Sequence, residues 1–480
     1  MILRNTLTNN SDEFNPIDPG RVTLYTCGPT VYSEPHIGNW VAFIRWDILV
    51  RTLLASGYTV ERVMNITDVG HLTGENEGDA DVGEDKMTKG ARQQGITEWE
   101  VADRYTRAFL DGMTALNLLP PEHLSKATEH IDIQIDLVRT LEEKGYTYVL
   151  DDGVYFDTSK FPNYADFAHL DLAAQQAGAR VTFNTAKRNP SDFVLWRLTP
   201  AGQTRTMEWD SPWGRGIPGW HIECSAMAMK YLGETIDIHT GGIDHIPVHH
   251  TNEIAQSEAA TGKRFANYWL HNAHLLSGGT KLSKSLGNSY TLDDLHEHGF
   301  TAMDFRMFIL QSHYRTETNF TWDNLSAAHN RLKRWQDIAA LRWQVHDTLQ
   351  NDDDKDARHD INSQILTAPH AALEALQNDL NAPEALVAIE RTMDEIEITP
   401  IKTIQHSALV QFAEWIDETL GLRLAESTPD ITDEQKRSII ERRHARDNKD
   451  WVASDRLRDK LLEDGIVLRD TPSTTIWTRQ

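Results

Sequence analysis

The chain has 480 residues, of which 40% are hydrophobic and 25% are charged, and its formal net charge is −25. This length suffices for two to four domains with ample buried core, and the composition is ordinary for a globular protein. No apolar run approaches the roughly 20 residues that span a bilayer. The N-terminal residues show neither the apolar core nor the cleavage site of a signal peptide. We therefore expect no membrane-spanning segment and no secretion.

The two cysteines and the charge narrow the class of protein further. Cys27 and Cys224 cannot form a disulfide framework, so we expect a cytoplasmic protein in a reducing compartment. The acidic net charge argues against non-specific binding of nucleic acid over the whole surface. A local basic groove is compatible with it, since salt screens charges beyond about 8–10 Å.

The first elements in chain order set the pattern of the N-terminal half. Residues 22–32 begin as an apolar strand that breaks at a Gly-Pro pair, and a polar cluster then opens a helix expected over 40–54. A strand, a Gly/Pro break and a helix start make up the phosphate-binding corner of an α/β nucleotide fold. A second strand is expected over 58–67, followed by a Gly-, Asp- and Glu-rich loop over 70–95.

The α/β alternation is then interrupted. Helices are expected over 97–116 and 129–144, and residues 148–158 form a hairpin pattern that turns at Asp152 and Gly153. Short strands and loops continue to about residue 215 before the alternation resumes. The sequence therefore predicts an α/β fold, with a split Rossmann-like parallel sheet and an inserted connective domain. The resumed elements are a helix after Cys224, strands over 235–239 and 268–270, and a helix over 250–261.

The remainder of the chain has a helical period of 3.6 residues almost throughout. We therefore expect an all-α C-terminal half. Its helices are expected over 301–311, 322–345, 359–379, 382–395 and 402–421, with a further boundary at 426–430.

Four residues have the chemistry of a metal site. Cys27 and Cys224 lie 197 positions apart, on either side of the insert, and His249 and Glu253 share one side of a helix because they are four residues apart. Together they make a zinc ligand set, with thiolates at about 2.3 Å and an imidazole nitrogen at about 2.1 Å. The alternatives are buried apolar cysteines and a surface His/Glu pair, and His250 could replace His249. If the two α/β halves rejoin in one parallel sheet, both cysteines and the start of the 250–261 helix fall near the carboxyl ends of the strands, where such folds bind ligands, which favours the metal.

Two motifs have the chemistry of a phosphate site. The segment His36-Ile37-Gly38-Asn39 stands at a helix N-terminus, where backbone N–H groups carry partial positive charge. Gly38 allows a nucleotide close to the backbone, and His36 and Asn39 can donate to phosphate oxygens. Downstream, a Gly-Gly hinge precedes Lys281 and Lys284, which a flexible loop can bring onto a triphosphate. Read alone, that second segment is equally compatible with a solvated turn.

The ordered pair of motifs resembles the class I aminoacyl-tRNA synthetases and, within them, the cysteinyl-tRNA synthetase family. The first motif resembles the HIGH signature, with Asn39 in place of its last histidine, and 281–285 (KLSKS) resembles KMSKS, with Leu282 in place of methionine. Asparagine keeps a side-chain donor and leucine keeps the apolar anchor. Segments 27–32, 219–227, 249–253, 449–459 and 465–466 also resemble the family, so the likeness covers essentially the whole chain.

The resemblance implies activation of cysteine by ATP, with catalysis by positioning and charge neutralisation and with Mg²⁺ on the phosphates. It implies that His36 and Asn39 bind phosphate and that Lys281 and Lys284 stabilise the developing charge. The ATP site implied by the resemblance comprises His36, Gly38, Asn39, Gly241, Gly242, Asp244, Lys281, Ser283 and Lys284, with the Gly-Gly pair and Asp244 lining the nucleoside pocket.

The resemblance also implies one zinc ion per chain that takes the substrate sulfur as a further ligand. A pocket that reads shape alone separates near-isosteres such as cysteine and serine by only about a hundredfold. A metal held by Cys27, Cys224, His249 and Glu253 prefers sulfur, so we expect no editing domain. Thr67 and Trp220 are candidates for the rest of the cysteine pocket, or equally for structural roles. 

The C-terminal region is expected to bind tRNA(Cys). Residues 435–460 contain nine Lys or Arg against five Asp or Glu, a local basic excess that fits phosphate contacts. Trp451 either stacks on an unpaired anticodon base or lies in a helical core. The domains expected are a catalytic domain (1–120 and 216–300), a connective insert (121–215), a stem-contact region after the KLSKS loop (301–330), a helical bundle (331–421) and an anticodon-binding region (422–480).

Two other functions stay open from the sequence. A cysteine ligase of the mycothiol pathway resembles the same catalytic half but lacks an extended anticodon-binding tail, so residues 422–480 favour the synthetase. A non-catalytic RNA- or zinc-binding paralogue is disfavoured by the intact His36, Lys281 and Lys284. We expect the chain to act as a monomer on L-cysteine, ATP and tRNA(Cys).

Overall fold

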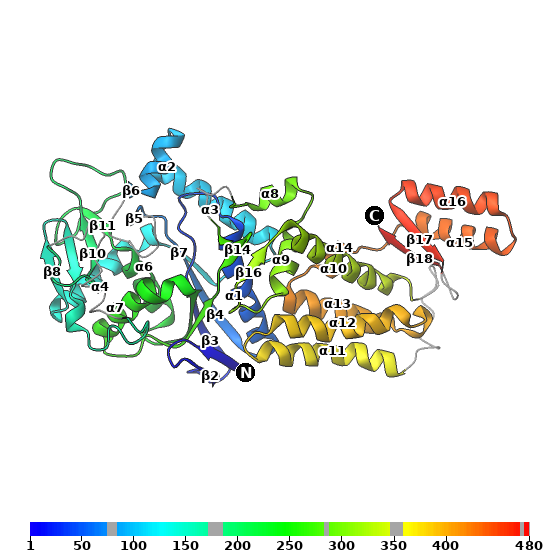
Figure 1. The fold of residues 1–480 in the computed structure, drawn as a ribbon, viewed down its shortest axis with the longest axis horizontal. Coiled ribbons are helices and arrows are strands. Elements are labelled where there is room, and N and C mark those ends of the chain that lie inside the picture. Colours follow the sequence, from blue (N-terminus) through cyan, green and yellow to red (C-terminus); the bar gives the residue numbers. More distant parts are fainter. Residues whose placement is uncertain (74–83, 171–185, 283–287, 346–358, 471–474, 480) are drawn as a thin grey trace. The chain divides into compact units, whose positions relative to one another are not determined.

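A computed structural model of the chain (Figure 1) describes residues 1–73, 84–170, 186–282, 288–345, 359–470 and 475–479. The chain divides into two compact units, one made of residues 1–295 with 314–319 and the other of 296–313 with 320–480. Among the described residues, no helix combines the length and the apolar character needed to cross a membrane.

A five-stranded parallel sheet forms the centre of the first unit. Its strand order is β13-β12-β3-β4-β7, and every neighbouring pair is parallel. Nearly all residues of β3, β12 and β13 are buried, as expected where helices cover both faces of a sheet. Their bounds are Arg21–Thr26 (β3), Thr59–Ile66 (β4), His123–Lys126 (β7), Ile236–Gly242 (β12) and Ala266–Asn272 (β13).

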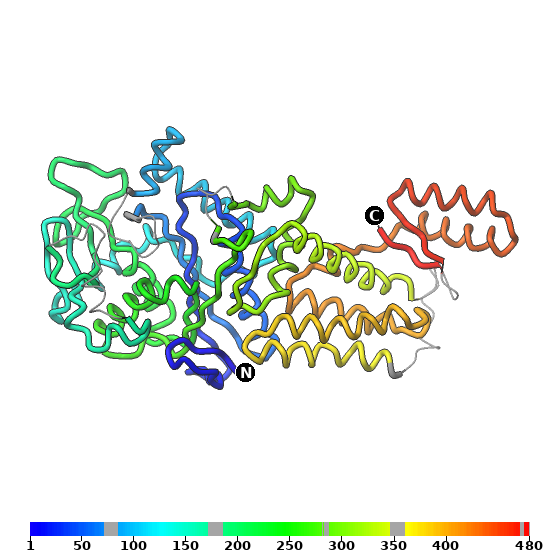
Figure 2. Tube along the Cα trace, in the orientation of Figure 1, coloured from blue at the N-terminus to red at the C-terminus, as the bar shows by residue number. Residues whose placement is uncertain are grey.

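The two central strands come from opposite sides of the insert, so the predicted split sheet is confirmed. In β12, His239 lies opposite Tyr25 of β3, and Figure 2 shows the two segments side by side although one is blue and the other green. From β3 the chain proceeds toward β4, whereas from β12 it proceeds toward β13. The boundary between β3 and β12 is therefore a topological switch point, where α/β sheets bind ligands at their carboxyl ends.

Helices connect and flank these strands. Helix α1 begins three residues earlier than the predicted helix at 40–54, because the side chain of Asn39 accepts from the backbone of His36 and the first turn is capped there. The helices of this part are α1 (Ile37–Ala55), α3 (Glu98–Ala115), α6 (Trp220–Leu232) and α7 (Thr251–Thr261), and α7 follows directly on a π-helical turn, η4 (Ile246–His250).

The segment predicted as a loop over 70–95 is partly regular. Strands β5 (Leu72–Thr73) and β6 (Glu84–Asp85) pair, and helix α2 (Lys86–Gln94) follows. The loop prediction was wrong over 86–94, because the Asp85 side chain accepts from the backbone N–H groups of Met87 and Thr88 and caps a helix whose sequence is mostly polar. Residues 74–83 of the expected loop lie outside the described residues.

The insert packs helix α4 (Ile131–Glu143) against a four-stranded antiparallel sheet. The predicted hairpin is confirmed, but its turn lies at Asp151 and Asp152 rather than at Asp152 and Gly153, since Leu150 pairs with Gly153. The expected start of the insert at residue 121 differs from the structure, where the short strand β7 still belongs to the parallel sheet; only one of its four residues is buried, so its pattern is weak. The sheet consists of β8 (Thr147–Leu150), β9 (Gly153–Phe156), β10 (Phe193–Leu198) and β11 (Gly216–Pro218).

Two smaller sheets complete the first unit. Strand β1 (Ile2–Asn5) pairs with β2 (Asn10–Glu13). The segment that leads into the KLSKS motif forms the sheet β15-β14-β16, with bounds Thr280–Lys281 (β15), Leu275–Ser277 (β14) and Thr318–Phe320 (β16). Helix α8 (Leu292–Glu297) follows the motif.

The second unit is largely helical, as predicted. Buried Arg306 donates through Nε to the carbonyl of Leu420, which ties α9 to the end of α13. The unit also contains a β-hairpin that the all-α expectation did not include, in which Trp477 packs with Ile439 and Leu461. Its elements are α9 (Ala302–Leu310), α10 (Trp322–Ala340), α11 (His359–Gln377), α12 (Ala382–Ile398), α13 (His406–Leu420), α14 (Leu424–Ser427), α15 (Asp433–Asp447), α16 (Trp451–Glu463), β17 (Ile466–Asp470) and β18 (Thr475–Arg479).

Candidate functional site

The four predicted metal ligands converge in the structure. One ligand atom from each of Cys27, Cys224, His249 and Glu253 lies within 4.8 Å of every other. His249 Nε2 is 3.0 Å from Glu253 Oε1, and Cys27 Sγ is 4.0 Å from the same oxygen. The two cysteines are free thiols. Cys27 and Cys224 are 197 positions apart in the sequence, and they lie close together because β3 and β12 are neighbours in the sheet.

Each of these residues occupies the carboxyl edge of the sheet. Cys27 directly follows β3, and Cys224 lies in α6, which precedes β12. His249 belongs to the π-helical turn η4 and Glu253 to the first turn of α7, which both follow β12. A π-helical turn inside a longer helical segment is frequent at functional sites.

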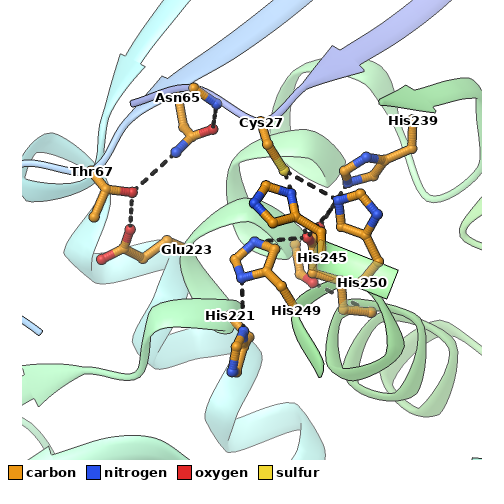
Figure 3. A network of polar contacts seen from close by, with 12 residues as sticks. Cys27, Asn65, Thr67, His221, Glu223, His239, His245, His249 and His250 are labelled. Carbon is orange, nitrogen blue, oxygen red and sulfur yellow. Dashed lines mark hydrogen bonds and ion pairs between the residues drawn. The ribbon is translucent and has the colours of Figure 1, made fainter. Parts of the chain in front are cut away.

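A second ligand set overlaps the first. Cys27, His239, His250 and Glu253 also bring their ligand atoms within 4.8 Å of one another. His250 Nε2 lies 3.4 Å from Cys27 Sγ, and His239 Nε2 lies 2.8 Å from Glu253 Oε2. The alternative of His250 replacing His249 is therefore present in the geometry. The two sets share Cys27 and Glu253, and the other two ligands are either Cys224 and His249 or His239 and His250. Figure 3 shows the three histidines beside Cys27.

The electrostatics of the cluster suit a divalent cation. Burial raises the pKa of Cys27 well above its usual value, whereas the Cys27 thiol, through a hydrogen bond, lowers the pKa of Cys224. Burial alone would raise the pKa of Glu253, but His239 and His249 outweigh it and hold the pKa below its usual range. Two sulfurs, a carboxylate and an imidazole nitrogen are donors that zinc accepts, so the residues fit this metal.

The His249 imidazole is held in a defined orientation. Burial would lower the pKa of His249, but Glu253 and Cys224 outweigh it and raise the pKa to about 10. Its Nδ1 lies 2.9 Å from His221 Nδ1, and burial lowers the pKa of His221, so that a neutral His221 accepts this hydrogen bond. This leaves His249 Nε2 facing Glu253, which is the arrangement by which outer residues orient a metal-binding histidine.

Several residues around the cluster were not predicted from the sequence. They are His71, His221, Glu223, His239, His245 and His271. His239 and His271 lie in β12 and β13, so their place at the carboxyl edge of the sheet is the signal that could have found them. His250 Nδ1 lies 2.7 Å from His271 Nε2, and His271 Nδ1 lies 2.7 Å from Thr6 Oγ1.

The two residues predicted to complete the substrate pocket lie beside the cluster. The ring of Trp220 is 5.3 Å from that of His249 and 6.3 Å from that of His71, between centroids. Thr67 is buried at the end of β4, and its hydroxyl donates to Glu223 Oε2 at 2.9 Å. Thr67 thus donates to a buried carboxylate that was not predicted from the sequence.

The two phosphate motifs meet at the start of α1. A Cβ atom added to Gly38 would lie 3.5 Å from Leu282 Cδ1 and 2.9 Å from His36 Cε1, so any side chain there would crowd the motif. The backbone N–H of Ile37 donates to the carbonyl of Tyr290 at 2.7 Å. Asn39 accepts from the backbone N–H of His36 at 3.0 Å, so it caps the helix. 

The lysine-bearing motif is described only in part. Lys281 ends strand β15, and the backbone at Gly278 and Gly279 has φ of 59° and 79° in the left-handed region that glycine favours. Ser283 and Lys284 lie outside the described residues.

The residues predicted to line the nucleoside pocket end β12 and follow it. A Cβ atom on Gly241 would lie 2.5 Å from His250 Cε1 and 2.6 Å from His245 Nδ1, so the absence of a side chain makes room for the histidines. Asp244 lies with one carboxylate oxygen 3.8 Å from His245 Nε2. A Cβ atom on Gly242 would lie 2.3 Å from Asp244 Oδ1. The structure thus places all three next to the metal cluster.

Comparison with known proteins gives consistent matches over the whole chain. Residues 13–330 match the model described as tRNA synthetases class I (C) catalytic domain, and residues 428–477 match that of the cysteinyl-tRNA ligase anticodon binding domain. The cysteine--tRNA ligase of Treponema denticola is 42% identical, over 99% of this chain and 99% of that protein. Cysteine--tRNA ligase 1 of Burkholderia lata is 44% identical, over 98% of this chain and 95% of that protein.

Solved structures share the fold at low sequence identity. Methionyl-tRNA synthetase of Mycobacterium tuberculosis, bound by methionyl-adenylate, matches with a TM-score of 0.60 and 14% identity, over 88% of this chain and 94% of that one. The LeuRS of Agrobacterium radiobacter, in a ternary complex with tRNA and LeuAMS, matches with a TM-score of 0.59 and 12% identity, over 88% and 86%. These matches support the α/β sheet and the helical part that follows it.

Proposed function

This chain belongs to the cysteinyl-tRNA ligase family of the class I tRNA synthetases, and we propose that it attaches L-cysteine to tRNA(Cys) at the expense of ATP. In the first step the cysteine carboxylate attacks the α-phosphate of ATP and pyrophosphate leaves. In the second step the cysteinyl group passes from the adenylate to a hydroxyl of the terminal adenosine of the tRNA. The observation that carries the choice of amino acid is the convergence of Cys27, Cys224, His249 and Glu253.

We propose that this cluster holds one zinc ion. Of the two overlapping sets, the one with both cysteines and His249 matches zinc better, because thiolates are the soft ligands that zinc prefers. When bound, zinc supplies a preference for a substrate thiolate over the hydroxyl of serine. Glu253 presents Oε1 to the cluster while His239 holds Oε2, and Trp220 covers the side of His249.

The proposed ATP site follows from the approach of the two motifs. The N-terminus of α1 offers backbone N–H groups to phosphate, and Gly38 leaves the space that a phosphate needs. His36 and Asn39 flank this end, and Asn39 also fixes the first turn as a cap. Lys281 and Lys284, with Ser283 between them, are proposed to neutralise the triphosphate, which Mg²⁺ accompanies. The proposed nucleoside contacts are Gly241, Gly242 and Asp244.

The proposed tRNA contact lies in the C-terminal region. Trp451 is 59% exposed and the adjacent Val452 is 83% exposed, so the alternative of Trp451 in a helical core is wrong. An exposed indole at the start of α16, among the basic residues of α15 and α16, is suited to stacking on an unpaired base. Arg442 is engaged with Asp470 and stabilises the hairpin, so it is structural.

The other two functions from the sequence have less support. A mycothiol-pathway ligase needs no anticodon-binding region, whereas residues 428–477 match one. A non-catalytic paralogue has no need to keep the two phosphate motifs close together. In this chain Gly38 of the first motif lies against Leu282 of the second. 

Two assays test the proposed function. The protein, loaded with zinc, is expected to catalyse cysteine-dependent exchange of pyrophosphate into ATP and to charge tRNA(Cys). The variant His36→Ala is expected to lose exchange, and Lys230→Ala, on an α6 surface position, is its control. No exchange with any amino acid would contradict the enzymatic function, and AMP formation that responds only to an amino sugar would support the mycothiol ligase. Sedimentation tests the proposed monomer.

A further inference from the structure

A hydrogen-bonded chain lies beside the metal ligands and has no part in the steps above. The Gly28 N–H donates to Asn65 Oδ1 at 2.7 Å, and Asn65 Nδ2 donates to Thr67 Oγ1 at 3.0 Å. Thr67 Oγ1 donates to Glu223 Oε2 at 2.9 Å, and His71 Nε2 lies 2.7 Å from Glu223 Oε1. We call these five residues the Glu223 network; Figure 3 shows Asn65, Thr67 and Glu223 next to Cys27.

The hydrogen bonds of the Glu223 network all run in one direction. In each bond the acceptor is the group closer to the Glu223 carboxylate. A carboxylate only accepts, so His71 Nε2 and Thr67 Oγ1 are both donors to it. The Thr67 oxygen in turn accepts from Asn65, whose own amide oxygen accepts from the backbone. Aligned donors of this kind strengthen one another at low dielectric. Each polar group in the chain is therefore oriented by Glu223 as the final acceptor.

The network is buried, so each of its polar groups needs a hydrogen-bond partner within the protein. Glu223 is 0% exposed, and Asn65, Thr67 and His71 are 2%, 1% and 7% exposed. A buried carboxylate is costly unless hydrogen bonds satisfy both oxygens, as they do here. A carboxylate that is fully enclosed in this way does not reach a substrate directly, so its effect passes through the residues that it holds.

Those residues adjoin both metal-binding cysteines. Gly28 follows Cys27, and Glu223 precedes Cys224 in α6. A Cβ atom on Gly28 would lie 1.7 Å from the Asn65 carbonyl oxygen, so the turn after Cys27 is pressed against β4. The network thus joins the turn after β3, the end of β4 and helix α6, which the sequence separates widely.

We propose that Glu223 is a positioning residue that sets the spacing of Cys27 and Cys224 for the metal, and that Thr67 acts through it. The proposal rests on the zinc site proposed above and deepens it. Without the carboxylate, the turn that bears Cys27 and the helix that bears Cys224 lose their common anchor. The two sulfurs then meet the metal with a less favourable geometry.

The test measures zinc affinity in protein that holds no substrate. In Glu223→Gln the shape is kept, but the amide N–H₂ faces either Thr67 or His71, so that residue must give up its role as donor and the alignment of donors toward residue 223 is lost. We expect zinc affinity, measured by competition with a chromophoric chelator, to fall about 10- to 100-fold, as when outer partners of metal ligands are removed. Thr67→Val is expected to lower zinc affinity similarly. Thr67→Ser, which keeps the hydroxyl, is expected to have the affinity of the parent protein.

A matched control lies in the neighbouring helix. Glu258 belongs to α7, and its Oε1 accepts from the backbone N–H of Phe265 at 3.1 Å. Glu258→Gln keeps this acceptor and removes a charge from the same helix without touching the Glu223 network, so its zinc affinity is expected to match that of the parent protein. 

Two outcomes decide the proposal. The double variant Glu223→Gln/Thr67→Val is expected to lose no more zinc affinity than the larger single change, because both act on one chain of bonds. Unchanged zinc affinity in both single variants, with a raised KM for cysteine in Thr67→Val, would overturn it and make Thr67 a substrate contact. If Glu223→Gln does not fold, the zinc affinities of Thr67→Val and Thr67→Ser decide the proposal. Since affinity is measured without cysteine or ATP, a failed exchange assay would contradict the proposed function and leave this result intact.

Discussion

Zinc binding is expected to release two protons, and the number released at high pH tests the electrostatics of the cluster. In the metal-free fold, burial raises the pKa of Cys27 well above its usual value, and the pKa of His249 is raised to about 10. The pKa of Cys224 is lowered and that of Glu253 lies below its usual range. A metal takes only deprotonated ligands, so its binding displaces the protons of Cys27 and His249.

The direction and size of the pH dependence of zinc affinity follow from these pKa values. Both raised groups stay protonated in the metal-free protein through neutral pH and are deprotonated in the complex, so zinc affinity rises with pH. Two protons correspond to about a hundredfold gain in affinity, or about 2.7 kcal/mol, for each unit of pH. Near neutral pH the proton count does not distinguish this cluster from one with unperturbed cysteines. Two ordinary thiols of pKa about 8.5 also release about two protons at about pH 7.5.

The decisive measurement is therefore made in alkaline solution. Calorimetric titration with zinc, held in a weak chelator and repeated in buffers of different ionisation enthalpy, counts the protons released. We expect at least about two at about pH 7.5 and about two at about pH 9.5, whereas unperturbed thiols would release less than about half a proton at the higher pH. A count that falls in this way would refute the raised pKa values of Cys27 and His249. Circular dichroism of the metal-free protein at the higher pH is the control for folding.

Three further predictions concern separate parts of the chain. Cys224→Ser is expected to abolish both zinc binding and the selectivity for cysteine over serine, measured by metal content after dialysis and by pyrophosphate exchange with each amino acid; retention of both would show that the ligand set is wrong. Arg45→Met removes buried bonds to two backbone carbonyls and to the Thr318 hydroxyl, so the free energy of unfolding in urea should fall by about 2–4 kcal/mol, against less than about 1 kcal/mol for exposed Arg21→Met. Trp451→Ala should lower charging of tRNA with exchange unchanged and stability altered by less than about 0.5 kcal/mol; an equal loss of exchange would contradict a role in tRNA binding.

The sequence by itself determined the features that are local to the chain. Apolar segments predicted four of the five strands of the parallel sheet, and turn chemistry predicted the hairpin over 148–158, although its turn lies one residue earlier than predicted, at Asp151 and Asp152. The two phosphate motifs and the chemical types of the metal ligands were also available, because each depends on residue identity at fixed spacing. The short polar strand β7 and the capped helix α2 were missed, since each forms through pairing or capping that its own pattern barely signals.

Only the tertiary structure decided which residues act together. Cys27 and Cys224 share a site because β3 and β12 pair across the insert, a long-range contact that no local pattern encodes. The same packing buries Glu223 against Thr67 and His71, and it places both His249 and His250 within reach of Glu253. Burial then sets the charge of each group, since the pKa of a thiol or imidazole depends on its desolvation and its neighbours rather than on its place in the chain.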